Sequence, residues 1–226
     1  FKVPRELTAH AGGAFLTLRG PMDTTDQKRH LRARMRIHRR SLSESDQRTA
    51  SERLSQQLLM LPGILNAKRV GAYFANDGEI DPLPALEALI GRGRKGYLPV
   101  LFASRRPRLQ FAEYFIDEPL KRGKYGIPVP FHDRRKLLNP VGLDWLFMPL
   151  VAFDEGGNRL GMGGGFYDAS LASRSNRTQW RRPVLIGLAH EFQKVDALNV
   201  DSWDVPLDGI LTDKTFRPIN WAAGAP

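Results

Sequence analysis

Two apolar runs separated by a helical segment, between residues 69 and 101, restrict the fold of this chain more than any other feature. Residues 69–75 and residues 95–101 have the composition of buried β-strands, and the segment between them begins at two prolines and ends at two glycines. A strand, a helix of about ten residues and a second strand form a crossover unit, which favours parallel strands. The sequence therefore predicts a single α/β domain with helices on both faces of a mostly parallel sheet.

The remaining segments extend this pattern on both sides of the crossover. A helix is predicted over residues 24–40, and a second one opens at Ser43, which has the capping-box spacing with Asp46. Further strands are predicted at residues 108–115, 144–153, 183–189 and 209–212, and a short helix at residues 166–173. Residues 117–143 are predicted to form a long irregular connection, a feature that in compact domains is usually functional or disordered.

The composition and the apolar runs exclude several classes of protein. The 226 residues include no cysteine, which excludes a disulfide framework, thiolate catalysis and Cys-based metal sites. The longest uncharged apolar run, residues 145–153, is much shorter than the ~20 residues of a membrane span. We therefore expect a soluble cytoplasmic protein with an extension of uncertain order over residues 1–23, a domain over residues 24–216 and a tail over residues 217–226.

The formal net charge of +10 is concentrated near the N-terminus. Ten basic residues but only three acidic ones lie within residues 1–40, where Lys28 and Arg32 are one helical turn apart and share a helix face. Such a pair can clamp two phosphate oxygens, whereas most exposed cations are merely solvated. The charge favours a polyanionic partner, either a nucleic acid or a phosphate-bearing small molecule, and does not choose between them.

Residues 159–168 (RLGMGGGFYD) contain four glycines within five positions. Glycine lets a ligand approach the backbone and permits positive φ angles, so that consecutive N–H groups can form an anion nest. The following helix would direct its N-terminal dipole at the same point, with Arg159 at the entrance of the loop. The run matches neither the P-loop nor the dinucleotide fingerprint. We interpret it as a phosphate-binding loop, with a flexible turn as the alternative.

Three acidic residues lie where predicted elements begin or end. Asp168 is in the first turn of the helix after the glycine loop, and Asp208 directly precedes the strand at residues 209–212. Mg²⁺ binds one or two carboxylates together with phosphate oxygens, so these aspartates could hold the ion or could be ordinary cap and turn residues. Glu79 follows the strand that ends near Phe74, at the sheet edge where ligands bind in open α/β folds. It could accept the paired N–H donors of a pterin-like heterocycle lying on Phe74, or only cap the next helix.

Considered together, several segments resemble the 5-formyltetrahydrofolate cyclo-ligase family, also called 5,10-methenyltetrahydrofolate synthetases. These segments are Lys28-x-x-x-Arg32, Asp77-Gly-Glu-Ile80, Gly126-Ile-Pro128, Met148-Pro-Leu-Val-Ala-Phe-Asp154 and Asn158-Arg-Leu-Gly-Met-Gly-Gly-Gly-Phe-Tyr-Asp168. They occur in the family's order over residues 25–215. The resemblance implies a three-layer α/β/α fold. It also implies a ligase of one-carbon metabolism that uses ATP and Mg²⁺ to convert 5-formyltetrahydrofolate to 5,10-methenyltetrahydrofolate, releasing ADP and phosphate through a phosphorylated formyl group.

The same resemblance assigns roles to individual positions. The residues implied to bind ATP are Lys28, Arg32, Arg159, Leu160, Gly161, Met162, Gly163, Gly164, Gly165, Phe166 and Tyr167. The residues implied to bind the folate are Arg32, Phe74, Glu79, Tyr125, Met162, Gly163, Gly164, Gly165 and Phe166. Asp168 and Asp208 are the implied Mg²⁺ positions, and no single residue is implied to act as a general acid or base.

The chain departs from the family pattern at two positions of the glycine loop. Met162 and Gly164 stand where some relatives carry Arg and Lys, so two cations that would help to neutralise phosphate charge are absent there. We expect a monomer whose partners are ATP and a folate that carries one or several glutamates. The alternatives are a basic nucleic-acid-binding α/β protein and a divergent ATP-dependent relative that acts on another substrate. The surplus of arginines at residues 34–40 is not explained by the enzyme interpretation.

Overall fold

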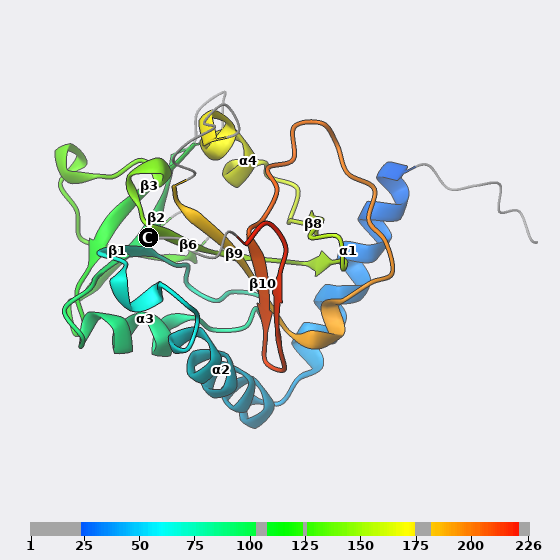
Figure 1. Cartoon of the computed structure of the whole chain (residues 1–226), viewed down its shortest axis with the longest axis horizontal. Coiled ribbons are helices and arrows are strands. Elements are labelled where there is room, and N and C mark those ends of the chain that lie inside the picture. Colours follow the sequence, from blue (N-terminus) through cyan, green and yellow to red (C-terminus); the bar gives the residue numbers. More distant parts are fainter. Residues whose placement is uncertain (1–23, 103–107, 124–125, 175–181, 222–226) are drawn as a thin grey trace, which may run out of the picture.

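A seven-stranded sheet forms the centre of the molecule in the computed structural model, which describes residues 24–102, 108–123, 126–174 and 182–221 (Figure 1). Its strand order is β11-β10-β9-β6-β1-β2-β3. The five inner strands are parallel, and β3 and β11 pair with their neighbours in the antiparallel direction. The strands of this sheet are β1 (Arg69–Gly71), β2 (Lys95–Phe102), β3 (Arg108–Tyr114), β6 (Trp145–Pro149), β9 (Val184–Ala189), β10 (Gly209–Thr212) and β11 (Phe216–Pro218).

Two short hairpins and several helices complete the described part of the chain. The hairpins are β4 (Leu120–Arg122) with β5 (Pro128–Pro130), and β7 (Ala152–Phe153) with β8 (Arg159–Leu160). The α-helices are α1 (Thr24–Ser41), α2 (Glu44–Leu59), α3 (Leu83–Ile90) and α4 (Phe166–Leu171). The 3-10 turns are η1 (Ile64–Asn66), η3 (Arg134–Lys136), η4 (Pro140–Gly142), η5 (Ala172–Arg174) and η6 (Glu191–Gln193).

The crossover predicted from the sequence is confirmed. Strand β1 pairs in parallel with β2, with Arg69 opposite Lys95, and α3 connects them. The apolar face of α3 is buried against the sheet, where Gly96 allows the close approach of Ile90. A Cβ atom at residue 96 would lie 2.6 Å from the Ile90 side chain, so a larger residue would push the helix away from β2.

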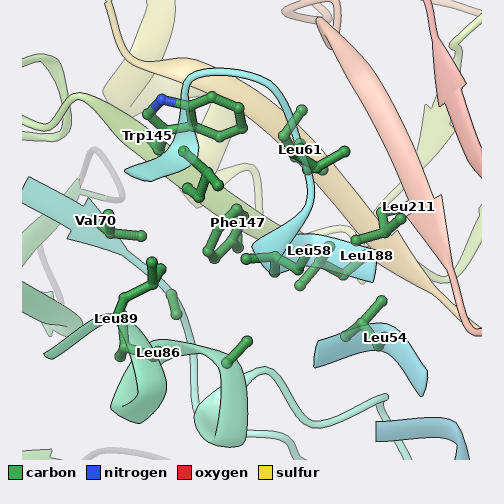
Figure 2. Close-up of a cluster of buried hydrophobic side chains, with 14 of the residues drawn as sticks. Leu54, Leu58, Leu61, Val70, Leu86, Leu89, Trp145, Phe147, Leu188 and Leu211 are labelled. Carbon is green, nitrogen blue, oxygen red and sulfur yellow. The ribbon is translucent and has the colours of Figure 1, made fainter. Parts of the chain in front are cut away.

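Helices cover both faces of the sheet, which confirms the three-layer α/β/α prediction (Figure 1). Figure 2 shows the core beneath α2 and α3, a single buried cluster to which Leu54, Leu58, Trp145 and Phe147 belong and in which Leu58 lies next to Phe147. The alternate residues of β6, Leu146 and Met148, point into the second core, which α4 covers through Leu171. Because β6 is buried on both faces, its sequence is a continuous apolar run rather than an alternating one.

Helix α1 does not lie on either face of the main sheet. Its apolar residues Leu31 and Met35 pack against Val151, Ala152 and Leu160 of the β7–β8 region, at the right of Figure 1. The helix therefore lies beside the start of the glycine loop. This packing places the basic residues of α1 near the segment that the sequence analysis singled out.

Two predicted strands are shorter than expected. The strand predicted over residues 144–153 ends at Pro149, because the Gln193 side chain donates to the carbonyls of Leu150 and Val151 at 2.6 and 2.9 Å. Residues 152–153 form β7, which belongs to a separate sheet. The strand predicted over residues 69–75 ends at Gly71, and the chain then enters the loop that carries Glu79.

Two other regions carry structure that the sequence analysis did not predict. The connection over residues 117–143 contains the β4–β5 hairpin and the turns η3 and η4. The segment predicted as a tail from residue 217 begins inside β11, and Trp221 packs its ring against Trp145, with 5.6 Å between ring centroids. No helix within the described ranges is both long enough and apolar enough to cross a membrane.

Candidate functional site

The glycine loop is held against α1 by Arg32. The Arg32 Nε donates a hydrogen bond to the carbonyl oxygen of Gly161 at 2.8 Å. Gly163 and Gly165 have positive φ angles of 93° and 63°, a conformation that L-residues with a side chain rarely adopt. A Cβ atom on Gly163 would lie 3.6 Å from the Arg32 guanidinium carbon. The structure therefore places Arg32, one of the residues implied to bind ATP, in contact with the glycine loop.

Lys28 and Arg159 contact a segment that the sequence analysis did not connect with the glycine loop, residues 199–205. Lys28 forms an ion pair of 2.6 Å with Asp201. Arg159 pairs with Asp168 and also donates to the carbonyl of Val205, whose N–H donates to the same aspartate at 3.2 Å. This segment thus joins α1 to the start of α4. Arg159 is mostly buried and ties three chain segments together, so it does not present a free cation at the loop entrance.

The loop after β1 carries a second charged cluster. Arg36, Arg39 and Arg40 of α1 all donate to the Asp77 carboxylate, and Arg39 also lies 3.7 Å from Glu79. Arg39 is 0% exposed. Asp77 itself has a positive φ of 55°. Burial acts to raise the pKa of its carboxyl, but the Arg36 and Arg40 guanidinium groups hold that pKa below the usual range. These contacts account for most of the arginine surplus at residues 34–40.

Glu79 is nearly enclosed, and its environment opposes ionisation. Burial raises the pKa of Glu79 to about 7, although the Arg39 guanidinium and the backbone N–H of Asn76 act in the opposite direction. Burial and the Glu79 charge together raise the pKa of Tyr167 well above its ordinary value. Tyr167 is the second residue of α4, directly after the glycine loop, so the helix that follows the loop carries a group that interacts electrostatically with Glu79.

The site lies at the carboxyl edge of the parallel strands, where the sequence analysis expected it. Glu79 follows β1, and His190 follows β9 and places its Nε2 3.3 Å from the carbonyl of Gly78. Gln47 of α2 also donates to the Gly78 carbonyl at 3.2 Å. Ligands of open α/β sheets bind at this edge. The loop carrying Glu79 is therefore fixed from three directions, by α1, α2 and the end of β9.

Phe74 is close to the site but is not a free aromatic face. Its ring is partly buried in the core beneath α2 and α3, and it meets Tyr114 edge-on with 6.3 Å between ring centroids. Tyr125, the other aromatic residue implied to contact the folate, lies outside the described residues. Met162 is exposed on the glycine loop and is available for contact with a ligand.

The two predicted Mg²⁺ positions are not brought together. Asp208 precedes β10, at the amino edge of the parallel strands, and its carboxylate pairs with Arg174 and accepts from the N–H of Leu185 at 2.7 Å. Asp168 lies at the opposite end of the α4–η5 segment from Arg174. Among the described residues no group of three or more Asp, Glu, His or Cys side chains could hold a metal ion. The geometry therefore does not support Asp208 as a ligand, whereas Asp168 remains a single partly exposed carboxylate beside the loop.

The sequence analysis did not identify Arg39, Asp77, Gln47 and His190 as parts of this site. One signal for Arg39 was present: Leu31, Met35 and Arg39 are spaced four residues apart and so lie on one face of α1. An arginine on an otherwise apolar stripe indicates a buried charge that needs a carboxylate partner. The partners of Gln47 and His190 are backbone atoms of residue 78, which no side-chain pattern reveals.

The fold and the site together define an α/β protein with a glycine loop held against a basic helix and a buried carboxylate after β1. The profile of the 5-formyltetrahydrofolate cyclo-ligase family matches residues 24–213. A 5-formyltetrahydrofolate cyclo-ligase of Haemophilus influenzae is 38% identical over 187 residues, covering 83% of this chain and 98% of the relative. The protein of that name from Escherichia coli K12 is 36% identical over 178 residues, covering 79% and 96%.

A solved structure agrees with the sequence comparisons. The 5,10-methenyltetrahydrofolate synthetase of Aquifex aeolicus superposes with a TM-score of 0.72 at 29% identity, covering 87% of this chain and 95% of that one. The chain belongs to the 5-formyltetrahydrofolate cyclo-ligase family and is an enzyme of that class, a ligase of folate one-carbon metabolism.

Proposed function

We propose that this chain converts 5-formyltetrahydrofolate to 5,10-methenyltetrahydrofolate and hydrolyses one ATP to ADP and phosphate in each turnover. The family membership supports the conversion and the use of ATP. The observation that carries the proposal for this chain is the contact of Arg32 with the glycine loop beside Glu79 and Tyr167. This arrangement would offer one set of groups for phosphates and another for a heterocycle.

The nucleotide would be bound mainly by α1 and by the backbone of the glycine loop. Lys28 and Arg32 would contact the phosphates, and the N–H groups of residues 161–167 would form the anion nest. Gly163 and Gly165 supply the positive φ angles that such a nest requires. The partners of Lys28 and Arg32 in the structure, a half-exposed carboxylate and a backbone carbonyl, are groups that a phosphate can replace.

The folate would be bound at Glu79. An ionised carboxylate can accept two N–H bonds from the amino and ring nitrogens of a pterin, and hydrogen bonds to a charged acceptor are the stronger kind. Met162 and Phe166, which border the loop, would contact the rest of the substrate, with Phe74 at the edge of the pterin. The buried Tyr73 donates to the carbonyl of Ile80 at 2.8 Å and keeps the loop backbone in place.

A single divalent cation fits the site better than a cage of protein ligands. Mg²⁺ commonly takes one or two carboxylates and completes its coordination with phosphate oxygens and water, so Asp168 together with the nucleotide would suffice. When bound, Mg²⁺ would neutralise charge on the phosphoryl oxygens during transfer. Because Asp168 also holds Arg159, it fixes the start of α4 as well.

The chemical steps follow from the need to activate a poor leaving group. The formyl oxygen attacks the γ-phosphorus of ATP, the bond to the bridging oxygen breaks and ADP leaves. N10 of the folate then attacks the activated formyl carbon, phosphate departs with the former formyl oxygen, and the N10 proton is released. The chain contributes alignment of the two substrates and positive charge from Lys28 and Arg32, rather than a single acid or base.

The direct test supplies 5-formyltetrahydrofolate, ATP and Mg²⁺ to the purified chain. We expect the near-UV absorbance of the methenyl product to rise with one ADP formed per product, and chelation of the metal to stop the reaction. The Asp168→Asn variant should need more Mg²⁺ for half-maximal rate, while Asp196→Asn, an exposed carboxylate outside the site, should not. Absence of the methenyl absorbance at any protein concentration would refute the proposal.

A further inference from the structure

Arg39 is the most completely buried charge in the described part of the chain, and the proposed reaction gives it no direct role. Its side chain is 0% exposed, although it belongs to a helix whose other basic residues are partly or largely exposed. A buried guanidinium is costly unless its charge is paired. Its two terminal nitrogens meet the Asp77 and Glu79 carboxylates and the Leu150 carbonyl, while its buried Nε has no hydrogen-bond partner among the described residues.

The two carboxylates depend on Arg39 to different degrees. Asp77 is contacted by Arg36 and Arg40 as well, so it keeps two cations if Arg39 is lost. Within the described ranges, Arg39 is the one cation at ion-pair distance from Glu79, at 3.7 Å. Removing the Arg39 charge therefore isolates Glu79 and leaves Asp77 neutralised.

The backbone holds this pair at a fixed distance. A Cβ atom on Gly78 would lie 2.8 Å from the backbone of Arg39, so α1 and the loop are in direct contact at that point. The side chain of Gln47 bridges them, because its amide donates to the carbonyls of both Arg39 and Gly78 at 3.2 Å. The loop consequently cannot move away from α1 to solvate Glu79 without breaking these contacts.

We infer that Arg39 is a positioning residue that favours the ionised form of Glu79 and orients it for the substrate heterocycle. The inference rests on the proposed role of Glu79 as the folate ligand. Arg39 supplies the positive charge that permits a carboxylate in a nearly dry site, while Asp77 and its two further arginines fix the guanidinium in place.

Several titratable groups near Glu79 interact electrostatically with its carboxyl. These groups are Arg39 of α1, Tyr167 of α4, Tyr73 after β1 and Asp77 of the loop itself. His190, which follows β9, contacts the carbonyl of the neighbouring Gly78. Burial raises the pKa of both tyrosines, so both stay neutral in the physiological range. Burial lowers the pKa of His190, which favours its neutral form. Arg39 is therefore the group that offsets the burial of Glu79.

The test measures the folate KM against pH from ADP release at saturating ATP and Mg²⁺. In the wild-type enzyme, the folate KM should rise as pH falls below about 7, because protonated Glu79 loses its acceptor capacity. In Arg39→Met, which preserves much of the side-chain length, the midpoint should move at least one pH unit upward. One unit corresponds to a tenfold higher folate KM at low pH, whereas kcat at saturating folate should change less than threefold.

Matched variants distinguish the loss of the Arg39–Glu79 pair from a general loss of positive charge on α1. Arg40→Gln removes another α1 cation that contacts Asp77 and is not paired with Glu79, so its midpoint should equal that of the wild type. Arg39→Lys should have a midpoint between those of the wild type and Arg39→Met. The lysine keeps a positive charge, but one ammonium cannot contact both carboxylates as the guanidinium does. If Arg39→Met shows no cooperative thermal transition, the Lys variant carries the test, and its midpoint must still lie above the wild-type value.

Two results would overturn different parts of the account. A wild-type midpoint in Arg39→Met, or in Arg39→Lys if the Met variant does not fold, would overturn the role of Arg39. A Glu79→Gln variant with the same pH dependence as the wild type would instead overturn the proposed role of Glu79 itself. A flat profile in Glu79→Gln combined with a shifted midpoint in Arg39→Met would support both.

Discussion

The two halves of α1 carry the same kind of residue and use it differently. In the N-terminal half, Lys28 and Arg32 meet a partly exposed carboxylate and a backbone carbonyl, one contact each. In the C-terminal half, three arginines converge on the Asp77 carboxylate, and Arg39 is entirely buried. The cations of the first half have partners that a ligand can replace, whereas the arginines of the second half are paired with a carboxylate of the protein.

This difference changes what the basic N-terminal region implies. A run of exposed cations would favour a nucleic acid, because affinity for such a partner grows with the number of phosphates contacted. Here, Arg36, Arg39 and Arg40 neutralise Asp77 instead. The positive charge that remains near the site is suited to a compact polyanion such as a nucleotide.

The largest effect should follow from removing a cation of the first half. Arg32→Ala deletes a guanidinium proposed to bind phosphate, and a hydrogen bond to a charged group contributes about 1.5–3 kcal/mol. We expect the ATP KM to rise by roughly tenfold to a hundredfold, measured at saturating folate. Arg29→Gln, which removes an exposed arginine of the same helix that pairs with Asp26, should leave the ATP KM unchanged. An equal rise in both variants would remove the distinction between these positions.

The next effect concerns the free energy of unfolding, which the buried Glu79 carboxylate lowers. The pKa of Glu79 is raised from 4.5 to about 7 in the folded state, so folding binds a proton between these values. Stability is therefore lost as pH rises from 4.5 to about 7, and the cost is complete above that pH. Glu79→Gln should raise the free energy of unfolding by on the order of 2 kcal/mol at pH 8 and by much less at pH 4.5.

Denaturant titration at the two pH values measures this change. Glu155→Gln provides the control, because that carboxylate is exposed and the pKa of Glu155 is lowered by Lys194 rather than raised. A Glu79→Gln variant that gains no stability at pH 8 would show that the site imposes no cost on the fold.

A smaller effect should come from the backbone of the glycine loop. Gly163→Ala forces a residue with a Cβ into a φ of 93°, which costs about 1–2 kcal/mol, while the new methyl makes only ordinary contact with Arg32. We expect that loss in the free energy of unfolding by denaturant titration. Gly161→Ala, where a Cβ meets no other atom within 4 Å and no positive φ is required, should be near neutral in stability. Equal losses would mean that strain at residue 163 is relieved by the loop.

The smallest effect should come from the outermost arginine of the second half. Arg40 is largely exposed and shares Asp77 with two other arginines, so Arg40→Gln should cost less than about 1 kcal/mol. The loss should shrink further in 1 M salt, because exposed charges are screened there. A loss of several kcal/mol would show that the cluster depends on all three arginines equally.

The architecture was predictable because it depends on local patterns. The crossover over residues 69–101 and the Ser43 cap are encoded by neighbours in sequence, and the Ser43 hydroxyl accepts from the N–H of Asp46 as its spacing indicated. Strand ends were less predictable. The strand at residue 149 stops because of Gln193, a contact across more than forty positions.

The site was predictable only in part, for the same reason. The glycine loop and Arg32 could be inferred, since each has a recognisable local pattern. Asp208 looked like a turn residue that could bind metal. Its carboxylate is instead neutralised by Arg174, which is 34 positions away in the sequence. Arg39 and Glu79 are likewise brought together only by the packing of α1 against the β7–β8 region and the loop after β1.

The most direct test of the division within this site measures two dissociation constants by calorimetry, one for a non-hydrolysable ATP analogue with Mg²⁺ and one for 5-formyltetrahydrofolate. Lys28→Ala should weaken the nucleotide at least tenfold and the folate less than threefold, because Lys28 lies on the proposed nucleotide side. Glu79→Gln should show the reverse pattern at pH 8. If both variants weaken the same ligand, or if neither weakens its own, the account of one site with a nucleotide side and a folate side is wrong.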